Sequence, residues 1–205
     1  MSASRTPNLI SATDKELHGF KRRVIMQTMT DQALKDAEER IIALIQTFVE
    51  MVGRKPEGDR GVTGHWGPDV DMGTAADWLT FDVISDLLYG RPLGLLQSAE
   101  LRWLPEVFRS ISQMAATSLF QPKFYLYKIN RLFLAARRRK LLQTGRWLGD
   151  LAREREQLGN DTQTKDIFYT MMNAEDPKTG RKFTRKDMWV ESVLLLAAGE
   201  SMPIP

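Results

Sequence analysis

The sequence predicts a mainly α-helical fold. Apolar residues recur at helical spacing in several segments, and the clearest run follows a Thr30-Asp31 pair that suits a helix N-cap: Leu34, Ala37, Ile41, Leu44, Ile45, Phe48 and Val52. No segment shows the sustained alternation of apolar and polar residues that is typical of a half-buried β-strand. At 205 residues, of which 42% are hydrophobic and 27% charged, the chain is long enough for one sizeable core or two small ones.

The first half of the chain contains two predicted helices separated by a loop. The Thr30 cap predicts a long amphipathic helix to Val52, and the segment 53–68, rich in glycine, proline and charge, predicts an exposed loop. Apolar residues from Trp78 to Leu88 then share one helical face. That helix is predicted to close at Tyr89-Gly90, because glycine after the last turn followed by Pro92 is a typical C-terminal signal.

Four further helices are predicted in the second half. They cover about 100–119, 131–157, 165–173 and a final apolar segment that runs to Gly199. A turn is predicted over Asp176–Gly180 from its Asp-Pro start and its glycine exit. Thr184 and Asp187 have the spacing of a capping box that opens the final helix.

The composition excludes several kinds of chemistry. Cysteine is absent, which excludes disulfides, thiolate nucleophiles and metal centres held by cysteine. The two histidines, His18 and His65, are too few for a three-histidine metal site, so the sequence predicts neither a metal site nor a catalytic residue. The N-terminus has no apolar core like that of a signal peptide, and no run approaches the roughly 20 apolar residues of a membrane span.

Basic residues cluster twice, at 21–23 and at 137–140. Acidic residues surround both clusters and no aromatic residues interleave with them, so nucleic-acid binding is not predicted. In the first cluster His18 and Arg22 are four residues apart and lie on one helical face. This pair suits a carboxylate clamp, whereas by spacing alone ordinary surface charge is the competing interpretation.

Three segments resemble fungal cytochrome P450 monooxygenases, in the order and spacing of that family. Residues 16–34, which begin Glu-Leu-His18-Gly-Phe-Lys-Arg22, resemble its helix C region. Asp71-Met72 and the segment from Trp78 to Gly94 are similar to helix E and the turn after it. The segments 166–170, 182–184 and 191–199 are similar to helix H and to the first half of helix I.

The resemblance covers residues 13–199 and implies a partial P450 fold, from helix C to early helix I, that lacks the haem-thiolate half. Residues 1–12 are predicted to be a disordered N-terminus, and residues 200–205 a tail outside the family pattern. In the family the helix C pair contacts a haem propionate, a role that passes to His18 and Arg22. The start of helix I lines the distal pocket, a role that passes to Ala198 and Gly199.

By resemblance the cofactor is haem, the substrate is an apolar small molecule, and the redox partner of a complete enzyme is an NADPH reductase. The motifs indicate fungal secondary metabolism, and the expected location is the cytoplasm or the surface of the endoplasmic reticulum. Where the family has an acid and a threonine in helix I, however, this chain has Gly199-Glu200-Ser201-Met202. The cysteine loop that ligates the iron is also missing.

The chain by itself is therefore expected not to catalyse the family's reaction. Two alternatives stay open at this point. One is a non-catalytic helical module that binds a ligand or a partner through apolar surface. The other is a relic or gene-model fragment without function.

Overall fold

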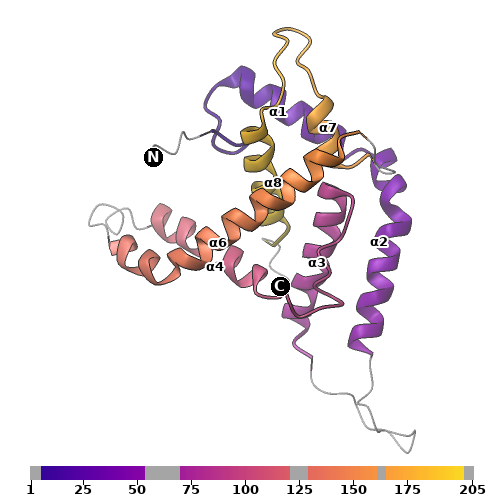
Figure 1. The fold of residues 1–205 in the computed structure, drawn as a ribbon, viewed down its shortest axis with the longest axis vertical. Helices are drawn as coiled ribbons and strands as arrows, with labels where there is room; N and C mark the ends of the chain where they lie inside the picture. Colours follow the sequence, from indigo (N-terminus) through magenta and orange to yellow (C-terminus); the bar gives the residue numbers. More distant parts are fainter. Residues whose placement is uncertain (1–5, 54–69, 121–128, 161–164, 201–205) are drawn as a thin grey trace, which may run out of the picture.

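The computed structural model describes residues 6–53, 70–120, 129–160 and 165–200 (Figure 1). These residues form seven helices, and Glu175 and Lys182 form an isolated antiparallel bridge. The helices are α1 (Lys15–Gln27), α2 (Asp31–Val52), α3 (Met72–Tyr89), α4 (Leu104–Phe120), α6 (Ile129–Leu158), α7 (Ile167–Asn173) and α8 (Arg185–Glu200). The prediction of a mainly α-helical fold is confirmed.

The predicted caps are present. The Thr30 hydroxyl accepts a hydrogen bond from the Ala33 amide at 3.3 Å at the start of α2. At the start of α8, Thr184 and Asp187 form the reciprocal capping box, in which the Asp187 amide donates to the Thr184 hydroxyl and the Thr184 amide donates to the Asp187 carboxylate. Gly90 ends α3 with φ of 72°, in the left-handed region that glycine enters without steric cost.

Four helix starts differ from the prediction: α6 and α7 each begin two residues away from it, and α3 and α4 differ more. Helix α3 begins at Met72, before the first of the apolar positions used to predict it, because the Asp71 side chain accepts hydrogen bonds from the amides of Gly73 and Thr74. Helix α4 begins at Leu104 and not near residue 100, because turns occupy the residues before it. In the predicted loop 53–68, residues 54–68 lie outside the described residues.

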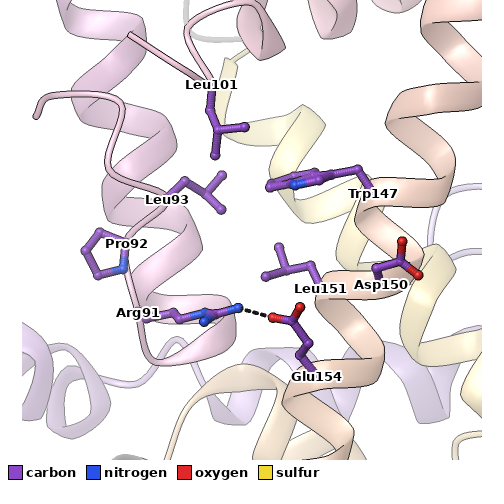
Figure 2. Close-up of a pocket in the computed structure, with 8 residues that line it drawn as sticks. All are labelled: Arg91, Pro92, Leu93, Leu101, Trp147, Asp150, Leu151 and Glu154. Carbon is purple, nitrogen blue, oxygen red and sulfur yellow. Dashed lines mark hydrogen bonds and ion pairs between the residues drawn. The ribbon is translucent and has the colours of Figure 1, made fainter. Parts of the chain in front are cut away.

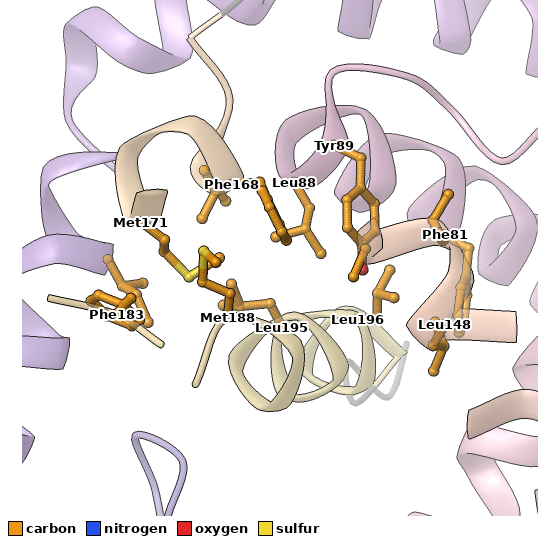
Figure 3. Close-up of a cluster of buried hydrophobic side chains, with 14 of the residues drawn as sticks. Phe81, Leu88, Tyr89, Leu148, Phe168, Met171, Phe183, Met188, Leu195 and Leu196 are labelled. Atoms are coloured by element: carbon orange, nitrogen blue, oxygen red, sulfur yellow. The ribbon is translucent and has the colours of Figure 1, made fainter. Parts of the chain in front are cut away.

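Helix α8 is the centre of the packing. It contacts α3, α4, α6 and α7, while α2 packs on α3 at the edge of the molecule (Figure 1). Figure 3 shows side chains of α3, α6 and α7 beside those of α8. The buried cluster includes Phe81, Leu88 and Tyr89 of α3, Leu148 of α6, Phe168 and Met171 of α7, and Met188, Leu195 and Leu196 of α8.

Two polar side chains form hydrogen bonds to the backbone of the connection between α3 and α4. The buried Asp82 carboxylate accepts hydrogen bonds from the amides of Leu95 and Leu96, each at 3.0 Å. The Arg102 guanidinium lies 3.8 Å from the centre of the Trp78 ring and donates to the Leu95 carbonyl at 2.8 Å. These contacts satisfy backbone groups that the turn leaves unpaired.

Residues 6–12 lie in the segment 1–12 that the sequence predicts to be disordered. In the structure these residues include a turn in which the Asn8 and Ser11 side chains each accept a hydrogen bond from the other residue's amide. The Leu9 amide donates to the Glu191 carboxylate of α8 at 3.1 Å. Residues 1–5 lie outside the described residues.

Candidate functional site

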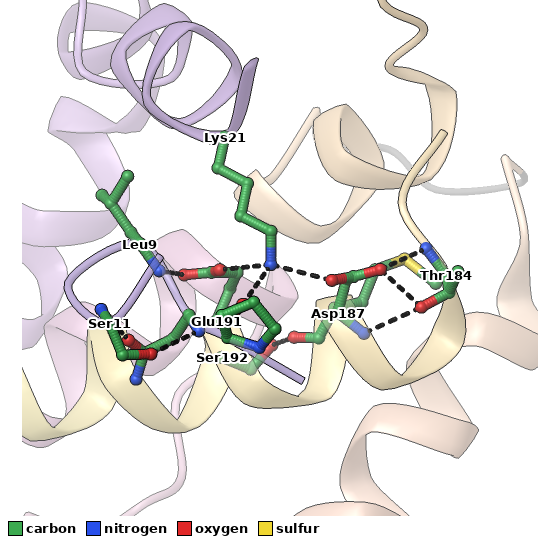
Figure 4. A network of polar contacts seen from close by, with 10 residues as sticks. Leu9, Ser11, Lys21, Thr184, Asp187, Glu191 and Ser192 are labelled. Atoms are coloured by element: carbon green, nitrogen blue, oxygen red, sulfur yellow. Dashed lines mark hydrogen bonds and ion pairs between the residues drawn. The ribbon is translucent and has the colours of Figure 1, made fainter. Parts of the chain in front are cut away.

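A buried ionic cluster joins α1 to the first turns of α8 (Figure 4). The Lys21 ammonium donates to the Pro7 carbonyl at 2.6 Å, to the Asp187 carboxylate at 2.8 Å and to the Glu191 carboxylate at 3.0 Å. Lys21 is 1% exposed and Glu191 is fully buried. All three ammonium hydrogens therefore have acceptors, which a lysine needs before it can stay charged inside a protein.

From the sequence, Lys21 is only one of the basic residues of the cluster at 21–23, and its burial is not predicted. A sequence signal was present, because Lys21 shares a helical face with Leu17 and with the buried Val24 and Ile25. The carboxylates that neutralise Lys21 are 166 and 170 residues away in the sequence. No pattern within α1 identifies them.

The cluster predicts an acid-sensitive contribution to stability. Burial raises the pKa of the Asp187 carboxyl, but hydrogen bonds from Lys21 and Thr184 outweigh burial and bring that pKa below its usual value. A carboxyl whose pKa is lower in the folded state stabilises the fold above its unfolded pKa, and this stabilisation disappears as the pH falls through the folded pKa.

We therefore expect the free energy of unfolding to decrease as the pH is lowered beneath about 4. The Asp187→Asn variant should show a smaller decrease over the same pH range. Urea unfolding of both proteins between neutral and acidic pH measures the difference. If the free energies of unfolding of the two proteins decreased in parallel toward acidic pH, this role for Asp187 would be contradicted.

His18 and Arg22 both lie on α1, at the edge of its buried face. His18 is half-buried and Arg22 is exposed. Neighbouring Arg23 pairs with Asp176 at 3.1 Å, whereas neither the His18 ring nor the Arg22 guanidinium has a hydrogen bond or ion pair within the described part of the chain. Among the residues that the structure describes, therefore, no other side chain competes for either group.

Ala198 and Gly199 lie in the last turn of α8. Leu195 and Leu196 are buried just before them, and Ala198 is exposed, so the helix leaves the core at this turn. Ala198 is seven residues beyond Glu191, which corresponds to about 10 Å along the helix axis. The ionic cluster at one end of α8 and the small residues at the other are therefore separate features of one helix.

The haem implied by the resemblance can be tested against these residues. A histidine and a guanidinium that have no other partner in the described part of the chain suit a haem propionate. The iron, however, needs an axial ligand, and the chain has no cysteine. Within the described ranges, no group of three or more histidine or acidic residues could hold a metal ion. The side chains present therefore fit the edge of a haem but do not fit a haem-thiolate centre.

A cavity of about 240 Å³ lies between the α3–α4 connection and α6 (Figure 2). Its apolar lining comes from Pro92, Leu93, Leu101, Trp147 and Leu151, and its charged lining from Arg91, Asp150 and Glu154. Arg91 pairs with Glu154 at 2.6 Å, and Asp150 pairs with Arg153 at 3.1 Å. Each of the three charged groups that line the cavity is thus paired with a side chain of opposite charge.

None of the described helices combines the length and the apolar character that crossing a bilayer requires.

Comparison with known proteins places these helices in a family. The cytochrome P450 family model matches residues 2–201. A cytochrome P450 monooxygenase of Gibberella zeae is 26% identical over 195 residues, which cover 95% of this chain and 44% of the relative. The monooxygenase ataY of Aspergillus terreus is 25% identical over 94% of this chain and 81% of its own length.

The fold agrees with solved P450 structures. The haem domain of cytochrome P450DA superposes with a TM-score of 0.66 at 18% identity, over 93% of this chain and 38% of that domain. The described helices thus form a partial P450 fold, and the chain spans less than half the length of the Gibberella zeae relative. Because the family model matches nearly the whole sequence and the helices follow the P450 arrangement, this chain belongs to the cytochrome P450 family.

Proposed function

We propose that this chain forms the helix C to early helix I part of a fungal monooxygenase that oxidises an apolar small molecule in secondary metabolism. The family match over residues 2–201 carries the proposal. The relatives from Gibberella zeae and Aspergillus terreus, both called cytochrome P450 monooxygenases, support the fungal origin and the reaction class. In such enzymes bound haem supplies the oxygen chemistry, and the protein positions it.

The proposed roles of this chain's residues concern binding and positioning. His18 and Arg22 hold a haem propionate, because their side chains have no competing partner among the described residues. Lys21 fixes α1 against α8, so the rotation of α1 that presents this pair is set by the ionic cluster. Ala198 and Gly199, in the last turn of α8, border the site of the apolar substrate in this proposal.

The iron ligand must come from outside these 205 residues, since they contain no cysteine. An NADPH reductase is the proposed electron donor of the complete enzyme. By itself this chain is proposed to bind haem weakly, through the propionate, and to catalyse no oxygen insertion.

Absorption spectroscopy tests this proposal. The purified chain is mixed with haem, reduced and exposed to carbon monoxide. We expect no absorption band of the thiolate-ligated type, because a cysteine thiolate is required for that band and none is present. A thiolate-type band from this chain alone would overturn the expectation.

Titration of the purified chain with haem, followed by absorption spectroscopy, tests the proposed clamp. Arg22→Ala is expected to weaken haem binding several-fold and to change the free energy of unfolding by less than about 0.5 kcal/mol, as for other surface substitutions. Lys15→Ala, at an exposed position of the same helix, is the matched control and should change neither. Equal haem affinity in the Arg22→Ala and Lys15→Ala variants would remove the clamp from the proposal.

A further inference from the structure

The cavity between the α3–α4 connection and α6 has two chemically different ends (Figure 2). Leu93 and Trp147 lie on opposite sides of it, Leu101 lies at one end, and the Arg91–Glu154 ion pair lies at the other. Leu93, Leu101 and Trp147 are each half-buried, since they pack on the core and also line the cavity. The cavity therefore offers apolar walls and one polar end, the usual composition of a small-molecule site.

Regular elements position both sides of this cavity. Gly90 ends α3 in the left-handed conformation and Pro92 has a restricted backbone, so the chain is constrained on both sides of Arg91. Trp147 and Glu154 are seven residues apart on α6 and share one face of that helix. Because the fold itself forms the cavity, a ligand can bind there without the cost of ordering a loop.

The polar end of the cavity favours a neutral ligand. Arg91 pairs with Glu154 at 2.6 Å, and Asp150 pairs with Arg153 at 3.1 Å. A ligand cation beside Glu154 is attracted by that carboxylate but repelled by Arg91, and a ligand anion experiences the reverse. A charged ligand therefore gains little net electrostatic energy at this position.

A hydroxyl group complements the Arg91–Glu154 pair. Among the described residues, the Arg91 guanidinium has no acceptor besides Glu154, and the Glu154 carboxylate has no donor besides Arg91. A guanidinium carries several N–H donors and a carboxylate several lone pairs, so both groups can form further hydrogen bonds. A ligand hydroxyl can accept from Arg91 and donate to Glu154 at the same time.

We propose that this cavity binds a neutral hydroxylated aromatic molecule of one or two rings, with its ring against Trp147 and its hydroxyl at the Arg91–Glu154 pair. An aromatic body suits the indole, because aromatic rings attract one another when offset or edge to face. The cavity volume of about 240 Å³ lies below the roughly 300–1,000 Å³ of pockets for drug-sized molecules, which limits the ligand to a small one. The inference requires neither haem nor oxygen chemistry, so it is independent of the proposed function.

Equilibrium dialysis of the 205-residue chain against β-naphthol tests the proposal. This probe has two fused rings and one hydroxyl, and it is uncharged at neutral pH. Naphthalene, which lacks the hydroxyl, is expected to bind at least about threefold more weakly. The anion β-naphthoate is also expected to bind more weakly than β-naphthol, since Glu154 repels it. Tighter binding of β-naphthoate would identify an anion site and contradict the neutral ligand.

Filling the cavity tests its location. Leu93→Trp is expected to weaken β-naphthol binding at least about tenfold, because the larger side chain occupies the space of the ligand. The matched control is Leu142→Trp, at an exposed position of α6 outside the cavity lining, which should leave binding within about twofold. Absence of β-naphthol binding to the unmodified chain, or equal affinity of the two variants, would show that the cavity is not the site.

Removing the guanidinium tests the recognition of the hydroxyl. Arg91→Leu is expected to weaken β-naphthol binding about threefold or more and to abolish the preference over naphthalene. Arg91 is exposed, so the variant should fold, and thermal unfolding followed by circular dichroism checks this. Arg146→Leu, at an exposed position of α6 outside the lining, is the control and should change neither affinity. If Arg91→Leu still preferred β-naphthol over naphthalene, the proposed recognition of the hydroxyl would be wrong.

Discussion

Replacing Lys21 with methionine is expected to lower the free energy of unfolding by about 3–5 kcal/mol, the range measured when one partner of a buried ion pair is removed. Methionine fills much of the same volume but leaves the buried Glu191 carboxylate, and that of Asp187, without their cation. It also removes the hydrogen bond to the Pro7 carbonyl. Urea unfolding followed by circular dichroism measures the loss.

Two further variants show whether the loss comes from uncompensated charge. Lys15→Met removes an exposed lysine from the same helix and should cost less than about 0.5 kcal/mol. Adding Glu191→Gln to Lys21→Met should recover part of the stability, because the double variant buries one charge fewer. If Lys21→Met cost no more than Lys15→Met, the ionic cluster would not hold α1 to α8.

Arg155→Met is expected to cost a similar amount, again about 3–5 kcal/mol. Arg155 of α6 is 3% exposed and binds Asp166 through two parallel hydrogen bonds, of 2.7 and 3.0 Å. Asp166 is also the N-cap of α7, where its carboxylate accepts from the Tyr169 amide at 2.6 Å. Removal of the guanidinium therefore leaves the buried Asp166 carboxylate without its cation. The same change weakens the N-cap of α7.

The exposed Arg153 supplies the control for Arg155. It pairs with Asp150 on the solvent side of α6, so Arg153→Met should cost less than about 1 kcal/mol. Asp166→Asn combined with Arg155→Met should be more stable than Arg155→Met alone, because asparagine keeps the cap without the charge. Thermal unfolding in parallel with urea titration ranks the three variants. If Arg155→Met were as stable as Arg153→Met, Asp166 would have another partner in the variant.

The helix caps were predictable because they are local. The hydroxyls of Thr30 and Thr184 bind amides three residues away, and Gly90 adopts its left-handed conformation at the residue that ends α3. The start of α3 was harder to place, because its first apolar signal comes at Trp78, whereas the Asp71 cap lies seven residues earlier. Boundaries that depend on a single polar side chain are weakly encoded in hydrophobic periodicity.

The candidate site likewise has one part that could be predicted from the sequence and one that could not. The spacing of His18 and Arg22 predicts that they share a face of α1, and the structure leaves both without a partner among the described residues. Lys21 lies between them in the sequence and carries the same charge as Arg22, yet it is buried. A sequence pattern gives the angular position of each residue around its helix, but it does not reveal which side of that helix another element covers.

The sequence by itself determined the helical class, most of the helix ends, the resemblance to the P450 family and the lack of a cysteine for the iron. These follow from local hydrogen bonding, apolar periodicity and composition, which require no knowledge of distant contacts. The tertiary structure decided that Lys21 and Arg155 are buried and that several aliphatic side chains of α2 are exposed. The physical reason is that the cost or benefit of placing a charge or an aliphatic side chain depends on what lies opposite, and for Lys21 those residues are 166 and 170 positions away.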